Sequence, residues 1–245
     1  MYSAVLDRKA SDRGPTTELW KGIVTNSNDP RGGFYHLDDF HELLTGRYTT
    51  SQAGGTGTLA LATDVSAIGV ALIDSGATTN TQGANVQRTG ITVEPAPGRI
   101  IVMEARLKGA AIGTGPEFFL GWSTVDTTVI ASGSNTSADH VGFEVTGTDN
   151  VLLVHTEDGG NRVSGATSPA TLSTTYQKLG IKIIGETGVE VWVDGAKVDV
   201  AFSAAPDVPA DSILVPTLVC QSNGTTQPVI HMDWWAVGWT PFPTT

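Results

Sequence analysis

The segment from residue 176 to 202 constrains the fold most, because apolar side chains recur in it with a period of two. Its three runs place on one face Leu179, Ile181 and Ile183, then Val189, Val191 and Val193, then Val198, Val200 and Phe202. Turn sequences separate the runs, first Gly185-Glu186-Thr187-Gly188 and then Asp194-Gly195. An Asp-Gly pair between alternating runs is among the strongest hairpin signals. The segment therefore predicts three consecutive antiparallel strands.

Alternating segments continue along the rest of the chain. They predict strands at 58–63, 99–107, 117–123, 141–146, 151–156, 212–221 and 228–239. Two segments, 70–80 and 124–137, are ambiguous between strand and loop, and no amphipathic helix longer than about two turns is found. About a dozen strands without helices form antiparallel sheets packed face to face. The predicted fold class is all-β, a jelly-roll β-sandwich of two antiparallel sheets.

Charge is distributed unevenly over the 245 residues, which hold 14 Lys+Arg and 25 Asp+Glu for a net charge of −11. Residues 1–57 hold six of the basic and seven of the acidic groups, so their net charge is about −1 and that of the rest of the chain is about −10. An acidic body disfavours a nucleic-acid partner, since phosphate binding depends on clustered Lys and Arg. No run is apolar enough for a membrane span or a leader peptide. We expect no nucleic-acid or membrane partner and no cofactor.

The first 33 residues contain several Pro and Gly and show no sustained periodicity. We interpret 1–33 as an extended N-terminal arm and 34–245 as the sandwich domain. The stretch Leu19–Val24 is too apolar for a purely solvated tail, so we expect the arm to become ordered against a partner; a disordered tail is the alternative. The arm residues that we assign to this contact are Trp20, Ile23 and Arg31.

An ordered set of short segments runs through the body of the chain. It comprises Asp38-Asp39-Phe40, Met103–Leu107, Phe118–Ser123, Val141–Val145, Tyr176–Ile183, Val189–Gly195 and Met232–Val237. Together they resemble the concanavalin A-like (laminin-G-like) sandwich, in the version found in structural proteins of tailed-phage virions. The resemblance extends over residues 34–240.

This resemblance implies a non-enzymatic bacteriophage capsid decoration or cement protein, made in the host cytoplasm and bound to the outer surface of the virion. The implied partners are the major capsid protein and further copies of the chain, as a homotrimer or homodimer, with glycans as an additional candidate. In this hypothesis the arm threads over neighbouring subunits. The competing hypothesis is a carbohydrate-binding, lectin-like adhesin module on the same virion.

The fold also resembles that of retaining glucanases, which place paired carboxylates on one strand face. Their chemistry needs two carboxyl groups about 5–5.5 Å apart, which positions i and i+2 of a strand supply. No predicted strand carries such a pair: Glu104 and Glu144 stand alone, and the acid nearest to Glu190 lies in a turn. The sequence contains five histidines but no Gly-x-Ser-x-Gly segment, the motif that would supply a serine nucleophile for a histidine base. We therefore expect no enzymatic activity and no catalytic residue.

Residues 36–42 and Cys220 are candidates for a metal site and a reactive thiol. Neighbouring positions of an extended strand face opposite ways, so we expect 36–42 to be a structural strand anchored by Leu37 and Phe40. A metal site there is the alternative, with the ligands His36, Asp38, Asp39, His41 and Glu42. A loop calcium site also stays open, with the candidates Asp149, Glu157 and Asp158. Cys220 lies in an apolar strand and is expected to be a buried, small hydrophobic residue.

Three tryptophans bear on how the outer surface of the sandwich is used. Trp234 and Trp235 are adjacent, so they face opposite ways and at most one of them enters the core. The other is covered by protein, exposed, or available as a platform for a sugar ring. Trp192 alternates with apolar neighbours that face the core, so we expect it to point outward. The outward aromatics that we assign to partner binding are Trp192 and Trp235.

Overall fold

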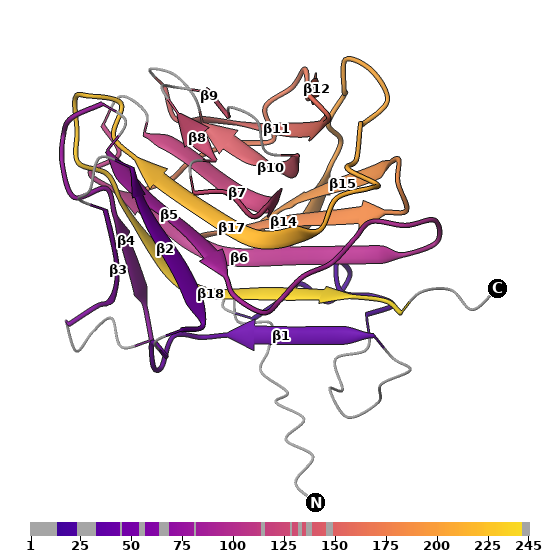
Figure 1. Ribbon diagram of the computed structural model, residues 1–245, viewed down its shortest axis with the longest axis horizontal. Coiled ribbons are helices and arrows are strands. Elements are labelled where there is room, and N and C mark those ends of the chain that lie inside the picture. Colours follow the sequence, from indigo (N-terminus) through magenta and orange to yellow (C-terminus); the bar gives the residue numbers. More distant parts are fainter. Residues whose placement is uncertain are drawn as a thin grey trace, which may run out of the picture.

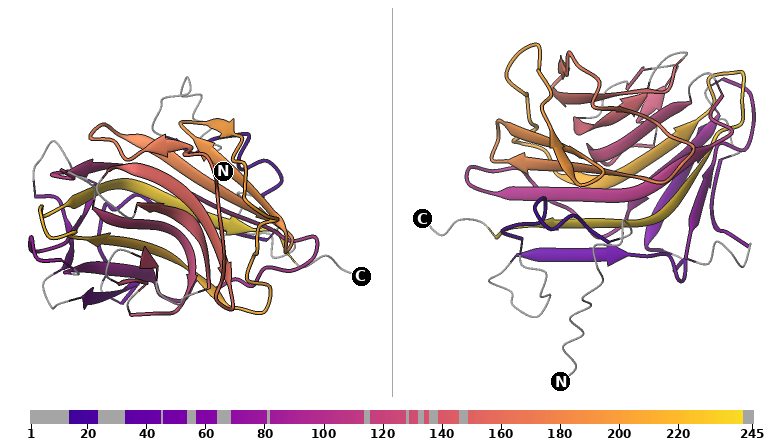
Figure 2. Two further views of the ribbon diagram at one scale, coloured as in Figure 1. Left: turned by 90° about the horizontal axis from the view of Figure 1, so that it is seen from above. Right: turned by 180° about the vertical axis from the view of Figure 1, so that it is seen from behind.

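The structure, a computed structural model, describes residues 14–23, 33–44, 46–53, 57–63, 69–80, 82–113, 116–127, 129–131, 134–135, 139–145 and 149–241. Over these residues it consists of two curved antiparallel sheets of eight strands each, packed face to face (Figures 1 and 2). The described residues contain no helix that is long and apolar enough to cross a membrane. The predicted all-β sandwich is confirmed.

Sheet A has the strand order β16-β15-β14-β6-β18-β4-β3, with β1 paired to the second half of β18. Its strands are β1 (Phe34–Asp38), β3 (Thr58–Leu61), β4 (Ala71–Asp74), β6 (Ile100–Ala110), β14 (Gln177–Ile184), β15 (Gly188–Val193), β16 (Ala196–Val198) and β18 (Val229–Trp239). The predicted hairpins are present, and Asp194 and Gly195 both adopt positive φ, 49° and 84°. Two positive φ values are what a two-residue hairpin turn of the type I′ family requires.

Sheet B has the order β12-β11-β10-β7-β17-β5-β2, with β13 paired to β11. Its strands are β2 (Tyr48–Ala53), β5 (Gly83–Arg88), β7 (Glu117–Thr124), β10 (His140–Val145), β11 (Val151–Asp158), β12 (Asn161–Ser164), β13 (Ala170–Thr171) and β17 (Leu214–Gln221). A separate two-stranded hairpin is formed by β8 (Ile130–Ala131) and β9 (Ser134–Asn135).

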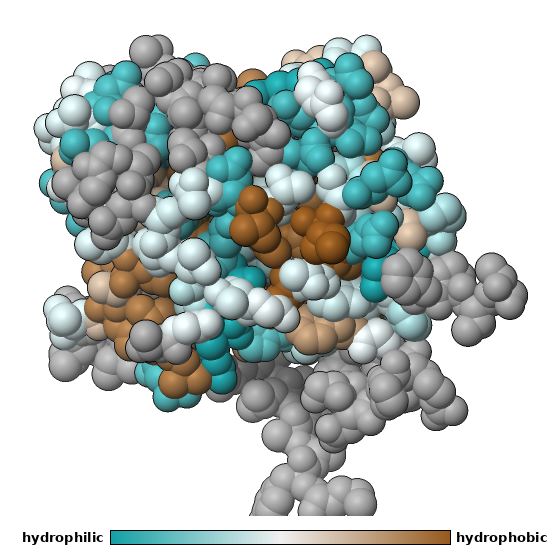
Figure 3. Space-filling view, in the orientation of Figure 1, coloured by the Kyte–Doolittle hydropathy of each residue, from teal (hydrophilic) through white to brown (hydrophobic). Residues whose placement is uncertain are grey.

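The main core fills the space between the two sheets and takes alternate residues from each central strand. On β6 these are Ile101, Met103, Ala105 and Leu107, and on β14 they are Leu179, Ile181 and Ile183. Leu59 and Leu61 of the edge strand β3 are only partly buried against this core. Figure 3 shows apolar side chains reaching the surface at the lower left, in the region of this edge.

The observed strands differ from the predicted ones at several places. The run at 198–202 does not continue as a strand, because the chain leaves sheet A after Val198. Phe202 instead forms an isolated bridge to Gly165, which follows β12 of sheet B. The ambiguous segment 70–80 contains β4, and neither β2 nor β5 was expected. Only Ala84 and Val86 of β5 belong to the core, while its other face carries polar side chains, so its apolar signal is weak.

The two adjacent tryptophans of β18 face opposite ways, but in the phase opposite to the one that we assigned. Trp235 lies in the main core with 1% of its surface exposed, whereas Trp234 lies on the outer face of sheet A. The cause is an irregularity of pairing between Met232 and Trp234, which inserts Asp233 as an extra residue. A β-bulge reverses the alternation beyond it. The assignment of Trp235 as an outward, partner-binding residue is therefore wrong.

Trp235 also anchors the beginning of sheet B. Its Nε1 donates a hydrogen bond to the Tyr48 hydroxyl at 3.3 Å, and that hydroxyl donates to Asp38 Oδ2 at 2.5 Å. Burial and the hydrogen bond to Asp38 raise the pKa of Tyr48 well above its usual value. The strand expected at 36–42 ends at Asp38, and Phe40 lies beyond it with a positive φ of 53°. Phe40 is fully buried, as expected for an anchor, whereas Leu37 is 41% exposed.

Replacing Trp235 by Ala should lower the free energy of unfolding by about 3–5 kcal/mol, because a large buried side chain leaves a cavity. Trp192→Ala serves as the comparison, since this half-buried residue lies outside the main core, and its cost should be less than half as large. Urea denaturation followed by circular dichroism measures both. Equal costs for the two variants would contradict the phase of β18.

Candidate functional sites on the outer faces of the two sheets

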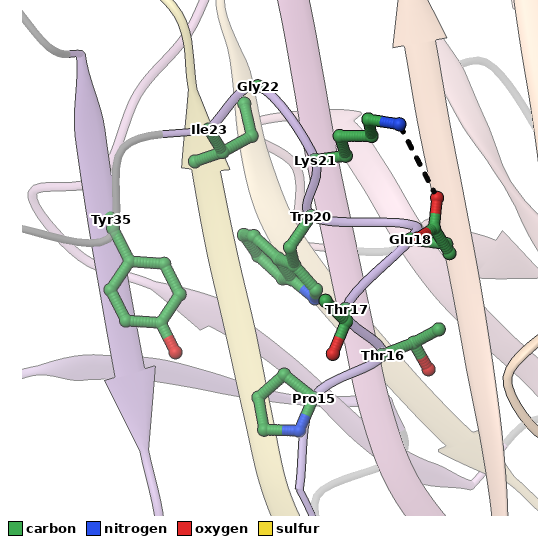
Figure 4. A pocket seen from close by; sticks show the side chains of 9 residues that line it. All are labelled: Pro15, Thr16, Thr17, Glu18, Trp20, Lys21, Gly22, Ile23 and Tyr35. Carbon is green, nitrogen blue, oxygen red and sulfur yellow. Dashed lines mark ion pairs between the residues drawn. The ribbon is translucent and has the colours of Figure 1, made fainter. Parts of the chain in front are cut away.

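Residues 14–23, here called the arm segment, lie across the outer face of sheet A. Figure 4 shows Trp20 pointing from this segment toward the strands, with Tyr35 of β1 beside it. The two rings meet edge to face, with their centroids 5.2 Å apart. The apolar cluster beneath the segment comprises Leu19, Trp20, Ile23, Val102, Trp234 and Ala236, flanked by Tyr35, Ile100 and Trp192. The arm segment is thus part of the folded domain.

Glu104 of β6 holds the arm segment through three hydrogen bonds. Its Oε2 accepts from the backbone N–H of Thr16 at 2.8 Å and from Trp20 Nε1 at 2.7 Å, while Oε1 accepts from Thr16 Oγ1 at 2.5 Å. Only 1% of the Glu104 surface is exposed. A buried carboxylate is costly unless it is hydrogen-bonded, so the arm segment and this strand stabilise each other.

Two glycines on the outer face of sheet A leave room for the arm segment. A Cβ atom at Gly180 would lie 2.5 Å from Leu19 Cδ2, and one at Gly238 would lie 3.1 Å from both Ile23 Cγ2 and Trp20 Cζ3. Contacts under 3.0 Å force a displacement of the neighbouring atoms. The sheet surface is therefore shaped to receive this segment of the same chain.

The residues that we assigned to a partner are placed differently by the structure. Trp20 and Ile23 are 5% and 6% exposed against the chain's own sheet. Trp192 does lie on the outer face, as predicted, but it packs beside the arm segment. Arg31 lies outside the described residues. The assignment of Trp20 and Ile23 to a partner is therefore wrong, because the chain's own sheet A covers them and Glu104, 88 positions from Thr16 in sequence, anchors the arm segment.

The outer face of sheet B carries a group of charged and imidazole side chains on four adjacent strands, which we call the charged layer. Its members are Glu117 (β7), His140 and Glu144 (β10), His155 and Glu157 (β11) and Arg162 (β12). Each member except Arg162 is buried. The group was not predicted, because its members lie on four separate strands and no single strand carries more than two of them. The alternation of Val141 and Phe143 with their neighbours already indicated that His140 and Glu144 share a face.

Glu144 and Arg162 form the centre of the charged layer. Arg162 Nη2 donates to Glu144 Oε2 at 2.6 Å, and Arg162 Nε donates to His155 Nδ1 at 3.2 Å. Since Nδ1 accepts this hydrogen bond, the His155 ring is neutral with its proton on Nε2, which lies 4.0 Å from Glu144 Oε2. Burial, with further contributions from Arg162 and His140, lowers the pKa of His155 to about 3.

Glu117 is the second carboxyl group beside this centre. Its side chain is 3% exposed and accepts a hydrogen bond from Gln221 Nε2 of β17. Burial raises the pKa of Glu117 to about 7; the bond to Gln221 opposes this, and the negative charge of Glu144 adds to it. Two neighbouring carboxyl groups in different environments are what acid–base chemistry requires.

A segment that we call the flap, described at residues 124–127 and 129, covers the other half of this face. Its backbone is held by polar side chains of β5: Asn85 Nδ2 donates to the Asp126 carbonyl at 2.7 Å, and Gln87 Nε2 donates to the Thr124 carbonyl at 3.0 Å. Val129 is fully buried against Phe119 and Val219. The flap therefore covers the centre of sheet B beside the charged layer.

The candidate metal ligands of the sequence have other partners. His36 Nε2 lies 3.1 Å from Arg88 Nη2, Asp38 accepts from Tyr48, and Asp39 lies 3.2 Å from His41. Within the described ranges no group of three or more His, Cys, Asp or Glu side chains could hold a metal ion. Glu157 lies 3.9 Å from His140 and belongs to the charged layer, apart from the loop residues Asp149 and Asp158 that we grouped with it.

Cys220 is fully buried in the core, as predicted, and burial raises the pKa of its thiol well above the usual value.

No family model matches this chain, and no curated protein matches it. Solved structures do share its fold. A protein of unknown function from Shewanella oneidensis MR-1 matches with a TM-score of 0.63 at 16% identity, over 95% of this chain and 96% of that one. An endo-1,3-beta-glucanase from Streptomyces sioyaensis matches with a TM-score of 0.56 at 15% identity, over 87% and 99%. Peanut lectin matches with a TM-score of 0.58 at 11% identity, over 86% and 99%.

These matches confirm the predicted concanavalin A-like jelly-roll fold, and identities this low show the fold alone. They also contradict our expectation that the protein is no enzyme, because the same sandwich occurs in enzymes such as the endo-1,3-beta-glucanase. The expectation rested on the lack of two carboxylates on one strand. In the folded chain, carboxyl groups from β7 and β10 interact across strands, so that criterion excludes nothing.

Replacing Glu104 by Gln should release the arm segment, because an amide cannot accept all three donors that the carboxylate accepts. We expect the free energy of unfolding to fall by about 1–3 kcal/mol, and Trp20 fluorescence to shift to the red. Glu190→Gln is the matched control, since Glu190 lies on the same outer face and pairs with an exposed Lys197 at 2.7 Å. Its cost should stay within about 0.5 kcal/mol. Equal effects would contradict the anchoring role of Glu104.

Replacing Glu117 by Gln should change how stability depends on pH. The pKa of Glu117 is about 7 in the folded state and near 4.5 when unfolded, so the folded state retains a proton that the unfolded chain has lost between these values. The stability from this group is present below pH 4.5 and lost as pH rises to 7. The free energy of unfolding of the wild type, relative to the variant, should fall by up to about 1 kcal/mol per pH unit in this window. Urea titrations from pH 4.5 to 8 measure it, and parallel curves would contradict the assignment.

Proposed function

We propose that the protein binds carbohydrate through the charged layer on the outer face of sheet B. The observation that carries this proposal is the linked arrangement of Glu144, Arg162 and His155, which are oriented by one another on three adjacent strands. Binding sites for small polar ligands combine a few fixed hydrogen-bonding groups with apolar surroundings. The similarity of the sandwich to peanut lectin supports the proposal.

Arg162 is the member of the charged layer through which a ligand reaches it. Its side chain is 27% exposed, whereas its ion-pair partner Glu144 has a fully buried side chain. A guanidinium held by a carboxylate keeps a fixed orientation and presents its remaining N–H groups to solvent. Sugar hydroxyls are suitable acceptors for these donors. We therefore expect Arg162 to contribute most of the binding energy among the accessible side chains.

Hydrolysis of a glycosidic bond is a second candidate, favoured by the pair formed by Glu117 and Glu144. Burial raises the pKa of Glu117 to about 7, in the range that a general acid requires, and Glu144 lies on the neighbouring strand, opposite Phe119 and one same-face position from Glu117. Two carboxyl groups with separate roles are the usual requirement of glycoside hydrolysis. In this candidate the saccharide has to pass Arg162 to reach the two carboxyl groups.

Attachment to a tailed-phage virion, as a decoration protein or an adhesin, stays our prediction for where the protein acts. The role that we gave to the arm in that hypothesis changes, since residues 14–23 pack on the chain's own sheet. A map of the parent particle by electron microscopy tests the location directly. Density for this sandwich on the capsid surface, in contact with the major capsid protein, is the expected result.

Calorimetric titration with a panel of neutral oligosaccharides tests the binding proposal. Arg162→Met should weaken binding about tenfold or more, because the variant keeps the aliphatic stem and loses the donors. The control Lys197→Met also removes an ion-paired cation, but on sheet A, and should bind as the wild type does. If no saccharide binds, or if both variants lose affinity equally, the proposal is wrong.

The same preparations distinguish binding from hydrolysis. Release of reducing ends that Glu117→Gln and Glu144→Gln each lower at least about a hundredfold is the result expected for catalysis. Saccharide binding without any release would contradict the second candidate and leave the first intact.

A further inference from the structure

The basic residues of the sandwich are concentrated on one surface. Residues 58–245 hold eight of the chain's basic side chains and eighteen of its acidic ones. Five of the eight point from the outer face of sheet A: Arg106, Lys108, Lys178, Lys182 and Lys197. Because the protein is strongly acidic, this clustering of cations gives the outer face of sheet A an electrostatic character of its own.

Within this face, one pair of like charges stands directly opposite in register, and a second cation lies opposite an imidazole. Arg106 of β6 is paired in register with Lys178 of β14, and Lys108 of β6 is paired with His231 of β18. Burial and the charge of Lys108 lower the pKa of His231. Like charges directly opposite in a sheet are destabilising, and the carboxylates of Asp233 and Asp194 beside the Arg106–Lys178 pair offset part of this cost.

A pocket of about 310 Å³ lies at the Arg106–Lys178 pair, lined also by Tyr176, Gln177 and Asp194. Arg106 is fixed in it from two sides. Its Nη1 donates to Asp233 Oδ2 at 2.7 Å, and its guanidinium carbon lies 4.2 Å from the centroid of the Tyr176 ring. Lys108 Nζ lies 5.0 Å from the same ring. The pocket therefore combines an aromatic wall with cations that are already oriented.

The arm segment forms one border of this pocket. Lys178 Nζ donates to the Gly14 carbonyl at 3.3 Å, and the Lys178 backbone N–H donates to Asp194 Oδ1 at 2.8 Å. Among the described residues, the lining of the pocket holds two cations (Arg106 and Lys178) and one carboxylate (Asp194). Just outside the lining, Lys108 lies beside the Tyr176 ring, and the carboxylates of Asp233 and Glu104 lie on the same face. The lining itself therefore carries one more positive than negative charge.

We propose that this pocket binds the sulfate or carboxylate group of an acidic saccharide. The local excess is a single positive charge on an acidic protein, which suits a ligand with isolated anionic groups better than a dense polyanion such as nucleic acid. The Tyr176 ring, over which Arg106 and Lys108 lie, forms an apolar wall of the pocket against which the sugar ring that carries the group can pack. The site lies on the sheet opposite to the charged layer, so it does not depend on the proposed function.

Calorimetric titration with four probes tests the proposal: sodium sulfate, a sulfated oligosaccharide, a uronate oligosaccharide and a neutral oligosaccharide of equal length. We expect the wild type to prefer an acidic oligosaccharide over the neutral one by about tenfold or more, with affinity falling as salt is raised. Whichever acidic oligosaccharide binds more tightly identifies the anionic group. Equal affinity for acidic and neutral oligosaccharides would overturn the proposal.

Matched variants locate the site. Lys178→Gln and Lys108→Gln should each weaken acidic-saccharide binding about fivefold to tenfold, since each removes one cation beside the ligand. Tyr176→Ala should weaken oligosaccharide binding but leave sulfate binding within twofold. The control Lys182→Gln removes the same charge from the same face of β14, away from the pocket, and should bind within twofold of the wild type. A loss in Lys182→Gln as large as in Lys178→Gln would overturn the proposal, because it would indicate only the general charge of the face.

A further variant separates this site from the charged layer. Arg162→Met on sheet B should leave acidic-saccharide binding unchanged, even if it abolishes binding of neutral saccharides. If Arg162→Met abolishes both, acidic saccharides bind on sheet B and the pocket on sheet A is not their site.

Discussion

Side chains alternate across every strand, so a sandwich of two sheets has one shared core and two outer faces that must be covered or solvated. Here the chain covers the centre of both outer faces itself. The arm segment lies over Trp234 and Val102 on sheet A, and the flap lies over Phe119 on sheet B. Both candidate binding sites lie beside these coverings.

The two coverings differ in how they are held. On sheet A, a buried carboxylate receives three hydrogen bonds from the arm segment, and Leu19 occupies the space above a glycine. On sheet B, the flap is held through its backbone by amide side chains of β5. Loss of the carboxylate contact leaves a charge buried without partners, whereas loss of an amide contact leaves a neutral group. The arm segment is thus the more strongly coupled of the two.

The charged layer on sheet B and the pocket at Arg106 and Lys178 on sheet A differ in the side chains that they present. Carboxyl groups and a neutral imidazole dominate the outer face of sheet B, around a single guanidinium. On sheet A, the outer face carries five cations, two of which, Arg106 and Lys178, lie opposite each other in register, together with the carboxylates of Glu104, Glu190 and Asp233. In our proposals these two faces bind saccharides of different charge, which one compact domain can do because its sheets separate the two sites.

The strand pattern, the hairpin at Asp194-Gly195 and the acidic body follow from the sequence alone, because period-two alternation and turn residues act over a few positions. Tertiary structure decided three further points. A bulge at Asp233 exchanged the faces of Trp234 and Trp235, Glu104 bound an arm segment that precedes it by more than eighty residues, and neighbouring strands assembled carboxyl groups that no single strand carries. Local periodicity contains no information on such pairings, since they depend on strand register and on which strands become neighbours.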